Sequence, residues 1–240
     1  MRKFASFIAI ILAASFSLLI AQPASASQDF PGAKDEKRKW LSHLDEWYTE
    51  YGVPQQQEQA LLEKIRSGGV VESDKAGSSP VTTELRSTTN QDVTVKRFSD
   101  GSITVSTIER PRTESDAPEV TPMFVGQCQG YSGGSGYSVN YDCLIQEANS
   151  TVDLAFRATY THTSGYDQIN DAWGAYYLSY YGNITNPELT IPRRNEVWNG
   201  GAYAQLKVRY NSANGAGSQG WVLRLWVQNN TAFTNLVKEG

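Results

Sequence analysis

Two segments near the N-terminus carry apolar side chains at helical spacing. Gly52 follows the first stripe, Pro54 stands near the first turn of the second, and Gly68-Gly69 follows it. Glycine commonly ends helices and proline fits a first turn, so both segments have clear limits. The spacing predicts an amphipathic helical hairpin with an aromatic face. Its apolar positions are Trp40, Leu41, Leu44, Trp47, Tyr48 and Tyr51, then Ala60, Leu61, Leu62 and Ile65.

The middle of the chain has linker-like composition on both sides of one short hairpin. Residues 70–89 are rich in Ser, Thr, Gly and charge, and residues 110–122 contain Pro111, Pro118 and Pro122. We interpret both as linkers. Between them, Val93 and Val95 and then Ile103 and Val105 alternate with polar residues around the turn Ser99-Asp100-Gly101, which predicts a β-hairpin.

From residue 123 onward the pattern changes to the two-residue period of strands. Aromatic residues gather here, and Gly- or Asn-rich breaks recur at short intervals. This is typical of an antiparallel β-sandwich or barrel. Weaker strand patterns cover 137–146, 172–181 and 188–192. The clearest alternating sets are Val152, Leu154, Phe156, Ala158 and Tyr160; Ala204, Leu206, Val208 and Tyr210; and Trp221, Leu223, Leu225 and Val227.

The predicted fold class is therefore mainly β. A helical hairpin, a linker and a short β-hairpin make up residues 27–118, and an antiparallel β-sandwich or barrel makes up residues 119–240. Cys128 and Cys143 are the only cysteines. In an oxidising compartment such a pair most simply forms one disulfide, which would contribute about 3 kcal/mol by closing a loop of about fifteen residues.

The first residues have the features of a secretory signal. Arg2 and Lys3 precede an apolar stretch, and Ala24-Ser25-Ala26 matches a cleavage site, so we predict a signal peptide over residues 1–26 and a secreted protein. An uncleaved anchor is the alternative. No later stretch is long and apolar enough for a membrane helix. The formal net charge is −4, which disfavours a nucleic-acid partner.

A run of aromatic residues supplies the candidate binding site. In a regular strand, Trp173, Tyr177 and Tyr181 would point one way and Tyr176 and Tyr180 the other, so both faces carry rings. Flat rings with hydroxyl groups suit stacking on sugars or on a protein surface. The alternative is that the helical hairpin covers one face. The candidate contacts are Trp173, Tyr176, Tyr177, Tyr180, Tyr181 and Trp198.

Catalytic and metal sites have weaker support. Gly130-Tyr131-Ser132-Gly133-Gly134 matches G-x-S-x-G, with Asp153 and His162 following in the order of an α/β-hydrolase, but the surrounding pattern is not strand, turn and helix. Two histidines and two cysteines leave little material for a metal centre, and Asp167 and Asp171 lack the rest of a calcium loop. We predict no cofactor and no metal.

Two functions of other classes stay open. A secreted glycoside hydrolase would need two carboxylates facing one cleft, and Glu147, Glu188 and Glu196 are the candidates. A membrane-acting toxin would need an amphipathic hairpin held in reserve, for which residues 137–156 are the one candidate. In a variant of the binding hypothesis, residues 27–118 form a pro-region that is removed on maturation.

Several short motifs are distributed along the chain after the signal. They are Tyr51-Gly52-Val53-Pro54, Gln59, Leu61-Leu62-Glu63-Lys64, Gly68, Ser73, Pro80-Val81, Arg97-Phe98-Ser99-Asp100-Gly101-Ser102 and Glu109-Arg110-Pro111. Together they resemble those of a group of uncharacterised secreted proteins of actinobacteria. The resemblance covers most of the chain after the signal, and includes the cysteine pair and the Trp-rich closing strand. It implies a secreted protein of a Gram-positive organism, and it transfers no catalytic residue.

Together these patterns predict a non-catalytic recognition protein outside the cell. Its expected partner is a glycan, a cell-envelope polymer or an extracellular protein.

Overall fold

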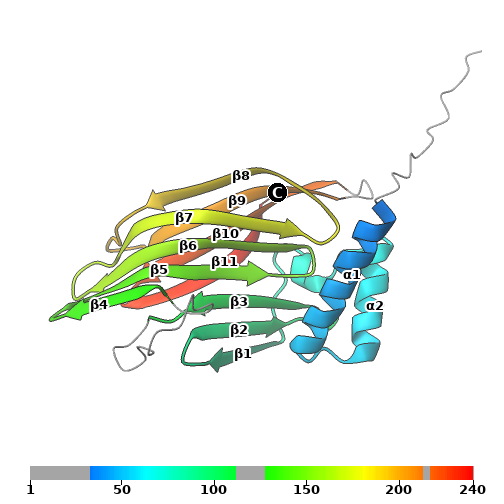
Figure 1. The fold of residues 1–240 in the computed structure, drawn as a ribbon, viewed down its shortest axis with the longest axis horizontal. Helices are drawn as coiled ribbons and strands as arrows, with labels where there is room; N and C mark the ends of the chain where they lie inside the picture. The colour runs from blue at the N-terminus through cyan, green and yellow to red at the C-terminus, as the bar shows by residue number, and fades with distance from the viewer. Residues whose placement is uncertain (1–32, 112–127, 213–216, 240) are drawn as a thin grey trace, which may run out of the picture.

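The computed structural model describes residues 33–111, 128–212 and 217–239. Its fold is mainly antiparallel β with two helices near the N-terminus (Figure 1). The elements are α1 Ala33–Glu50, α2 Gln55–Arg66, the 3-10 helix η1 Glu72–Asp74, β1 Thr82–Ser87, β2 Gln91–Arg97, β3 Ile103–Glu109, β4 Gly130–Gly134, β5 Tyr137–Ala148, β6 Val152–Thr163, β7 Gln168–Ser179, β8 Gly182–Arg193, β9 Ala202–Ser212, β10 Ser218–Gln228 and β11 Thr231–Glu239.

The strands form two sheets. Sheet A has the order β1-β2-β3-β5-β6-β7, with β4 paired to β5, and sheet B has the order β11-β10-β9-β8. The two sheets pack as a sandwich, in which the inner faces of β5 and β6 contact sheet B. The alternating residues predicted from the sequence form this core, so the predicted fold class is confirmed. Buried members include Ile145, Leu154, Phe156, Leu206, Leu223 and Leu225.

The helices cover the opposite face of sheet A at β2 and β3. Val95 and Val105 pack there with Leu44, Tyr48 and Leu61 of the helices in a second buried cluster. The predicted helical hairpin and β-hairpin are thus both present. Sheet A therefore buries its inner face at β5 and β6 and its outer face at β2 and β3.

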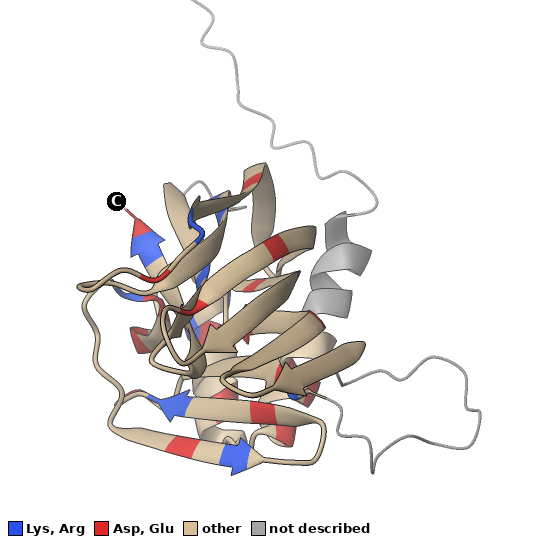
Figure 2. Cartoon of the chain, turned by 90° about the vertical axis from the view of Figure 1, so that its left-hand side faces the viewer, with Lys and Arg blue, Asp and Glu red and all other residues tan. Residues whose placement is uncertain are grey.

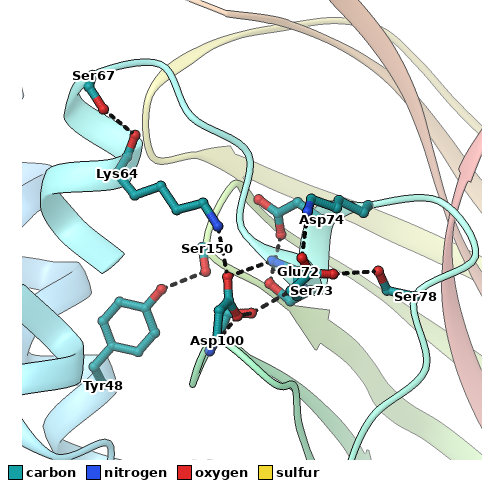
Figure 3. Close-up of polar contacts among 11 residues, drawn as sticks. Tyr48, Lys64, Ser67, Glu72, Ser73, Asp74, Ser78, Asp100 and Ser150 are labelled. Atoms are coloured by element: carbon teal, nitrogen blue, oxygen red, sulfur yellow. Dashed lines mark hydrogen bonds and ion pairs between the residues drawn. The ribbon is translucent and has the colours of Figure 1, made fainter. Parts of the chain in front are cut away.

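Polar contacts attach the helical segment to the sandwich (Figure 3). The hydroxyls of Tyr48 and Ser150 are 2.6 Å apart, and the Lys64 Nζ donates to Asp100 Oδ2 over 3.0 Å. Asp74 accepts hydrogen bonds from the hydroxyls of Ser73 and Thr151. Burial raises the pKa of Asp74 to about 6, and its hydrogen bonds only partly oppose this. The contacts fix α1 and η1 on the turn between β5 and β6, and α2 on the turn between β2 and β3.

The predicted disulfide between Cys128 and Cys143 is present, and both cysteines are buried in the sandwich core. It fixes the chain just before β4 to the middle of β5. A disulfide is compatible with an extracellular protein. Among the described residues no helix is long and apolar enough to cross a membrane.

Three features differ from the sequence-based expectations. Residues 82–87, within the predicted linker, form β1, an edge strand whose residues are all exposed and which therefore lacks hydrophobic alternation. β8 begins at Gly182, before the predicted 188–192. Finally, β3 pairs with β5, so one sheet includes strands from both predicted units. The predicted signal peptide and the boundary near residue 120 lie outside the described residues.

Candidate functional site

An open groove lies on the inner face of sheet A beside the edge of sheet B. Sheet A is the wider sheet, and β11, the edge strand of sheet B, packs over β3 and β5, so the inner faces of β1 and β2 extend beyond it (Figure 1). The groove has a volume of about 1010 Å³, and residues 230–234 of the β10–β11 turn and β11 form one wall. This lies at the upper end of the roughly 300–1,000 Å³ range of small-molecule pockets.

The strand register places polar side chains on the groove floor. Ser106 of β3 pairs with Thr94 of β2, which pairs with Leu85 of β1, and all three line the groove. The neighbouring positions Val93 and Val95 point to the helix-covered face because side chains alternate along a strand. One hairpin thus supplies an apolar face to the helices and a polar face to the groove.

Two buried polar atoms of the lining lack a protein partner. Ser106 is 6% exposed and Asn140 is 3% exposed. Within the described ranges, the Ser106 Oγ and the Asn140 Oδ1 make no hydrogen bond. Buried polar groups are nearly always hydrogen-bonded to protein or to something bound, so these atoms are available to a ligand or to water. Both belong to neutral side chains.

The charged groups of the lining are paired. Lys96 Nζ lies 3.6 Å from the buried Glu147 Oε1, and Arg110 Nε lies 3.1 Å from Asp92 Oδ1. Figure 2 shows acidic and basic positions interspersed along the strands.

Glu109 also belongs to the groove lining, and its carboxylate forms an ion pair with Arg157 of β6. Arg157 Nη2 lies 3.1 Å from its Oε2, and the Leu144 N–H donates to the same oxygen. Burial raises the pKa of Glu109, although these two partners oppose the shift. The groove therefore presents balanced charge.

Aromatic rings lie at both sides of the groove. Tyr131 of β4 is 47% exposed, and Phe233 of β11 is 40% exposed. Phe233 is the last ring of a row across the outer face of sheet B. Its ring centroid lies 6.5 Å from that of Trp226, and the Trp226 centroid lies 4.6 Å from that of Tyr203. This row holds the Phe233 ring in place at the rim.

One end of the groove is fixed by two acidic groups, the buried Asp167 and the half-buried Glu196. Asp167 Oδ2 is 3.2 Å from His162 Nδ1 and accepts the N–H of Asn230 over 2.7 Å. Glu196 accepts the N–H groups of Asp167 and Asn229. These bonds connect the β6–β7 loop to the β10–β11 turn. Asp167 and Glu196 are thus committed to structure, while one edge of the His162 ring lines the groove.

The hydrolase-like motif does not form an elbow. Residues 130–134 are strand β4, followed by a turn into β5. Asp153 accepts hydrogen bonds from Gln146 Nε2, whereas His162 contacts Asp167, so Ser132, Asp153 and His162 have no shared contact in the described structure.

The predicted aromatic site is divided by a bulge. Between the pairs Ala155–Tyr176 and Arg157–Trp173, β7 contains one extra residue, and Gly174 adopts φ +64°. The prediction that Trp173 and Tyr177 share a face was wrong, because the extra residue shifts the alternation. Trp173 and Tyr176 lie on the outer face, both partly exposed.

The other four predicted aromatic contacts lie in separate settings. Tyr177 is paired with Leu154 and so lies on the inner side. Tyr180 is 2% exposed and packs with Tyr181 against the helical cluster. Trp198 is 91% exposed in the β8–β9 connection. The helices cover Tyr180 and leave Trp173 and Tyr176 accessible.

The three carboxylates considered for glycoside hydrolysis have different surroundings. Glu147 is buried with Lys96, Glu188 is exposed on β8, and Glu196 holds two backbone N–H groups. Among the described residues, no two of them share a hydrogen-bond or ion-pair partner. Across all residues that the structure describes, no group of three or more His, Cys, Asp or Glu side chains is arranged to hold a metal ion.

The groove itself escaped the sequence analysis, because its lining comes from strands far apart in the chain. Comparisons with known protein families, with curated proteins and with solved structures gave no match, so the candidate site stands on its geometry.

Proposed function

We propose that this chain is a secreted, non-catalytic recognition protein that binds a glycan chain in the groove between β1–β3 and β11. The observation that carries the proposal is the pair of buried, unpartnered polar atoms on the lining, Ser106 Oγ and Asn140 Oδ1. A glycan hydroxyl both donates and accepts hydrogen bonds, so it can satisfy either atom. The exposed Tyr131 ring offers an apolar face for a sugar ring.

The test is retention of the protein on immobilised or gel-embedded polysaccharides. Ser106→Ala removes a hydroxyl that has no protein partner, so we expect unchanged folding stability and binding about tenfold weaker. Tyr131→Ala should also weaken binding. Structural damage would reduce stability as well, and the melting temperature of each variant measures that separately.

The matched controls are Trp173→Ala and Tyr176→Ala on the outer face of β7. They remove exposed rings of similar size outside the groove. We expect both controls to bind as the parent does. If instead they lose binding while Ser106→Ala retains it, the site is the β7 surface and the groove assignment is wrong.

A further inference from the structure

The groove lining distinguishes between charged and uncharged ligands. Polymers outside cells include anionic ones, which proteins hold mainly with unpaired Lys and Arg. In the groove, Lys96 faces Glu147 at 3.6 Å, and Arg110 faces Asp92 at 3.1 Å. His162 is 3.2 Å from Asp167. Each Lys and Arg of the described lining therefore has an acidic partner, and so does the His162 ring.

The atoms that lack a protein partner are uncharged. Ser106 Oγ is a hydroxyl and Asn140 Oδ1 is an amide oxygen. Hydroxyl or amide groups of a ligand can satisfy them without any charge on that ligand. A carboxylate or phosphate brought into the groove would lose water without gaining an unpaired cation, and it would lie near Asp92.

We infer that the groove binds an uncharged polysaccharide, an inference that rests on the function proposed above. The size of the groove, about 1010 Å³ and open beside β11, fits several linked sugar rings better than one monosaccharide. The Tyr131 ring contacts a sugar ring face from the β4 side, and the Ser106 and Asn140 side chains bond hydroxyls beside it. The paired charges keep the floor neutral.

The first experiment compares neutral polysaccharides (dextran, mannan, xylan and laminarin) with polygalacturonate and teichoic acid, each at low and high salt. We expect retention by at least one neutral polymer, with affinity that changes less than twofold with salt. Tighter binding to an anionic polymer with steep salt dependence would overturn the inference. The proposed function would survive that result if Ser106→Ala still weakened binding. No retention on any polymer would overturn both.

A charge variant tests the pairing directly. Asp92→Asn frees Arg110 at the groove, so we expect this variant to gain at least threefold in affinity for polygalacturonate, and the gain to vanish at high salt. Glu84→Gln is the control: it removes the same charge and frees Arg86 on the outer face of the neighbouring strand. Equal gains in both variants would show a general charge effect and count against a neutral groove.

Discussion

Two halves of sheet A bury opposite faces, and cross-strand rows of residues show where the change occurs. One inner-face row runs through Phe156, Ile145 and Ile108 and then reaches Asp92. On the outer face, Val105 pairs with Val95 under the helices. The sheet thus has an apolar inner face where sheet B covers it and a polar one where sheet B ends. A sheet face that is left uncovered but still polar can line a groove without disturbing the packed core.

The largest expected difference is in the stability lost when one inner-face residue is truncated in the half of sheet A that sheet B covers and one in the half that forms the groove. Phe156→Ala should lower the free energy of unfolding by about 3–5 kcal/mol, because it leaves a cavity in the sandwich core. Thr94→Ala, on the groove floor, should change it by less than about 0.5 kcal/mol. Urea denaturation of both variants measures the difference. Similar losses would mean that the groove half is packed like the core.

The disulfide tests whether the covered half depends on its covalent link. Replacement of Cys128 and Cys143 by Ala should lower the free energy of unfolding by about 3 kcal/mol, because the disulfide closes a loop and so reduces the conformational entropy of the unfolded chain. Denaturation of the variant, with the reduced parent as a second sample, checks this. A loss under about 1 kcal/mol would contradict the expectation.

Asp74 tests the attachment of the helices that cover the outer face. Its folded pKa of about 6 lies above its ordinary value of 3.8, so the buried carboxylate destabilises the folded protein above pH 6. This penalty disappears as the pH falls through 6 toward 3.8. We therefore expect the free energy of unfolding of Asp74→Asn, relative to that of the parent, to increase by on the order of 2 kcal/mol as the pH rises from 4 to 8. Urea denaturation at several pH values measures this difference.

Asp100 provides the control for this pH effect. Burial acts against its charge, but hydrogen bonds from Ser102, the Glu72 N–H and Lys64 prevail and lower its pKa. Its contribution to stability is therefore present at neutral pH and is lost in acid, so Asp100→Asn should show the opposite trend. Parallel pH profiles for the two variants would refute the assignment.

The smallest expected effect concerns the bulge at Gly174. An added Cβ would meet only Arg157 at ordinary contact distance, so Gly174→Ala should cost about 1 kcal/mol, from the positive φ alone. Thermal unfolding measures the cost. A cost near zero would show that β7 can adopt the regular alternation, with Trp173 and Tyr177 on one face.

Hydrophobic alternation predicted the parts of the fold whose two faces differ. Leu154 and Leu223 alternate with polar neighbours and both lie in the core. β1 was missed because all of its residues are exposed, and the bulge was missed because Gly174 carries no side chain that would mark it. Neither feature is therefore visible in the order of hydrophobic and polar residues along the sequence.

The candidate site was less predictable than the fold. Ser106 and Thr94 are ordinary polar residues in the sequence, and Asn140 belongs to a separate strand. Their alignment depends on strand register and on where sheet B ends, which one sequence does not specify. The exposed aromatic residues were visible in the sequence, but the helices that bury Tyr180 attach through contacts far along the chain.

The contacts that hold the helices also determine when they can dock. Tyr48 bonds Ser150 across 102 positions, and the Lys238 Nζ donates to the Asp74 carbonyl across 164. Bringing such distant residues together has an entropic cost that is repaid only once both partners are ordered. Helical turns in α1 and α2 can form early, yet their tight packing requires the β5–β6 turn and β11. We therefore expect docking of the first elements to be one of the last steps of folding.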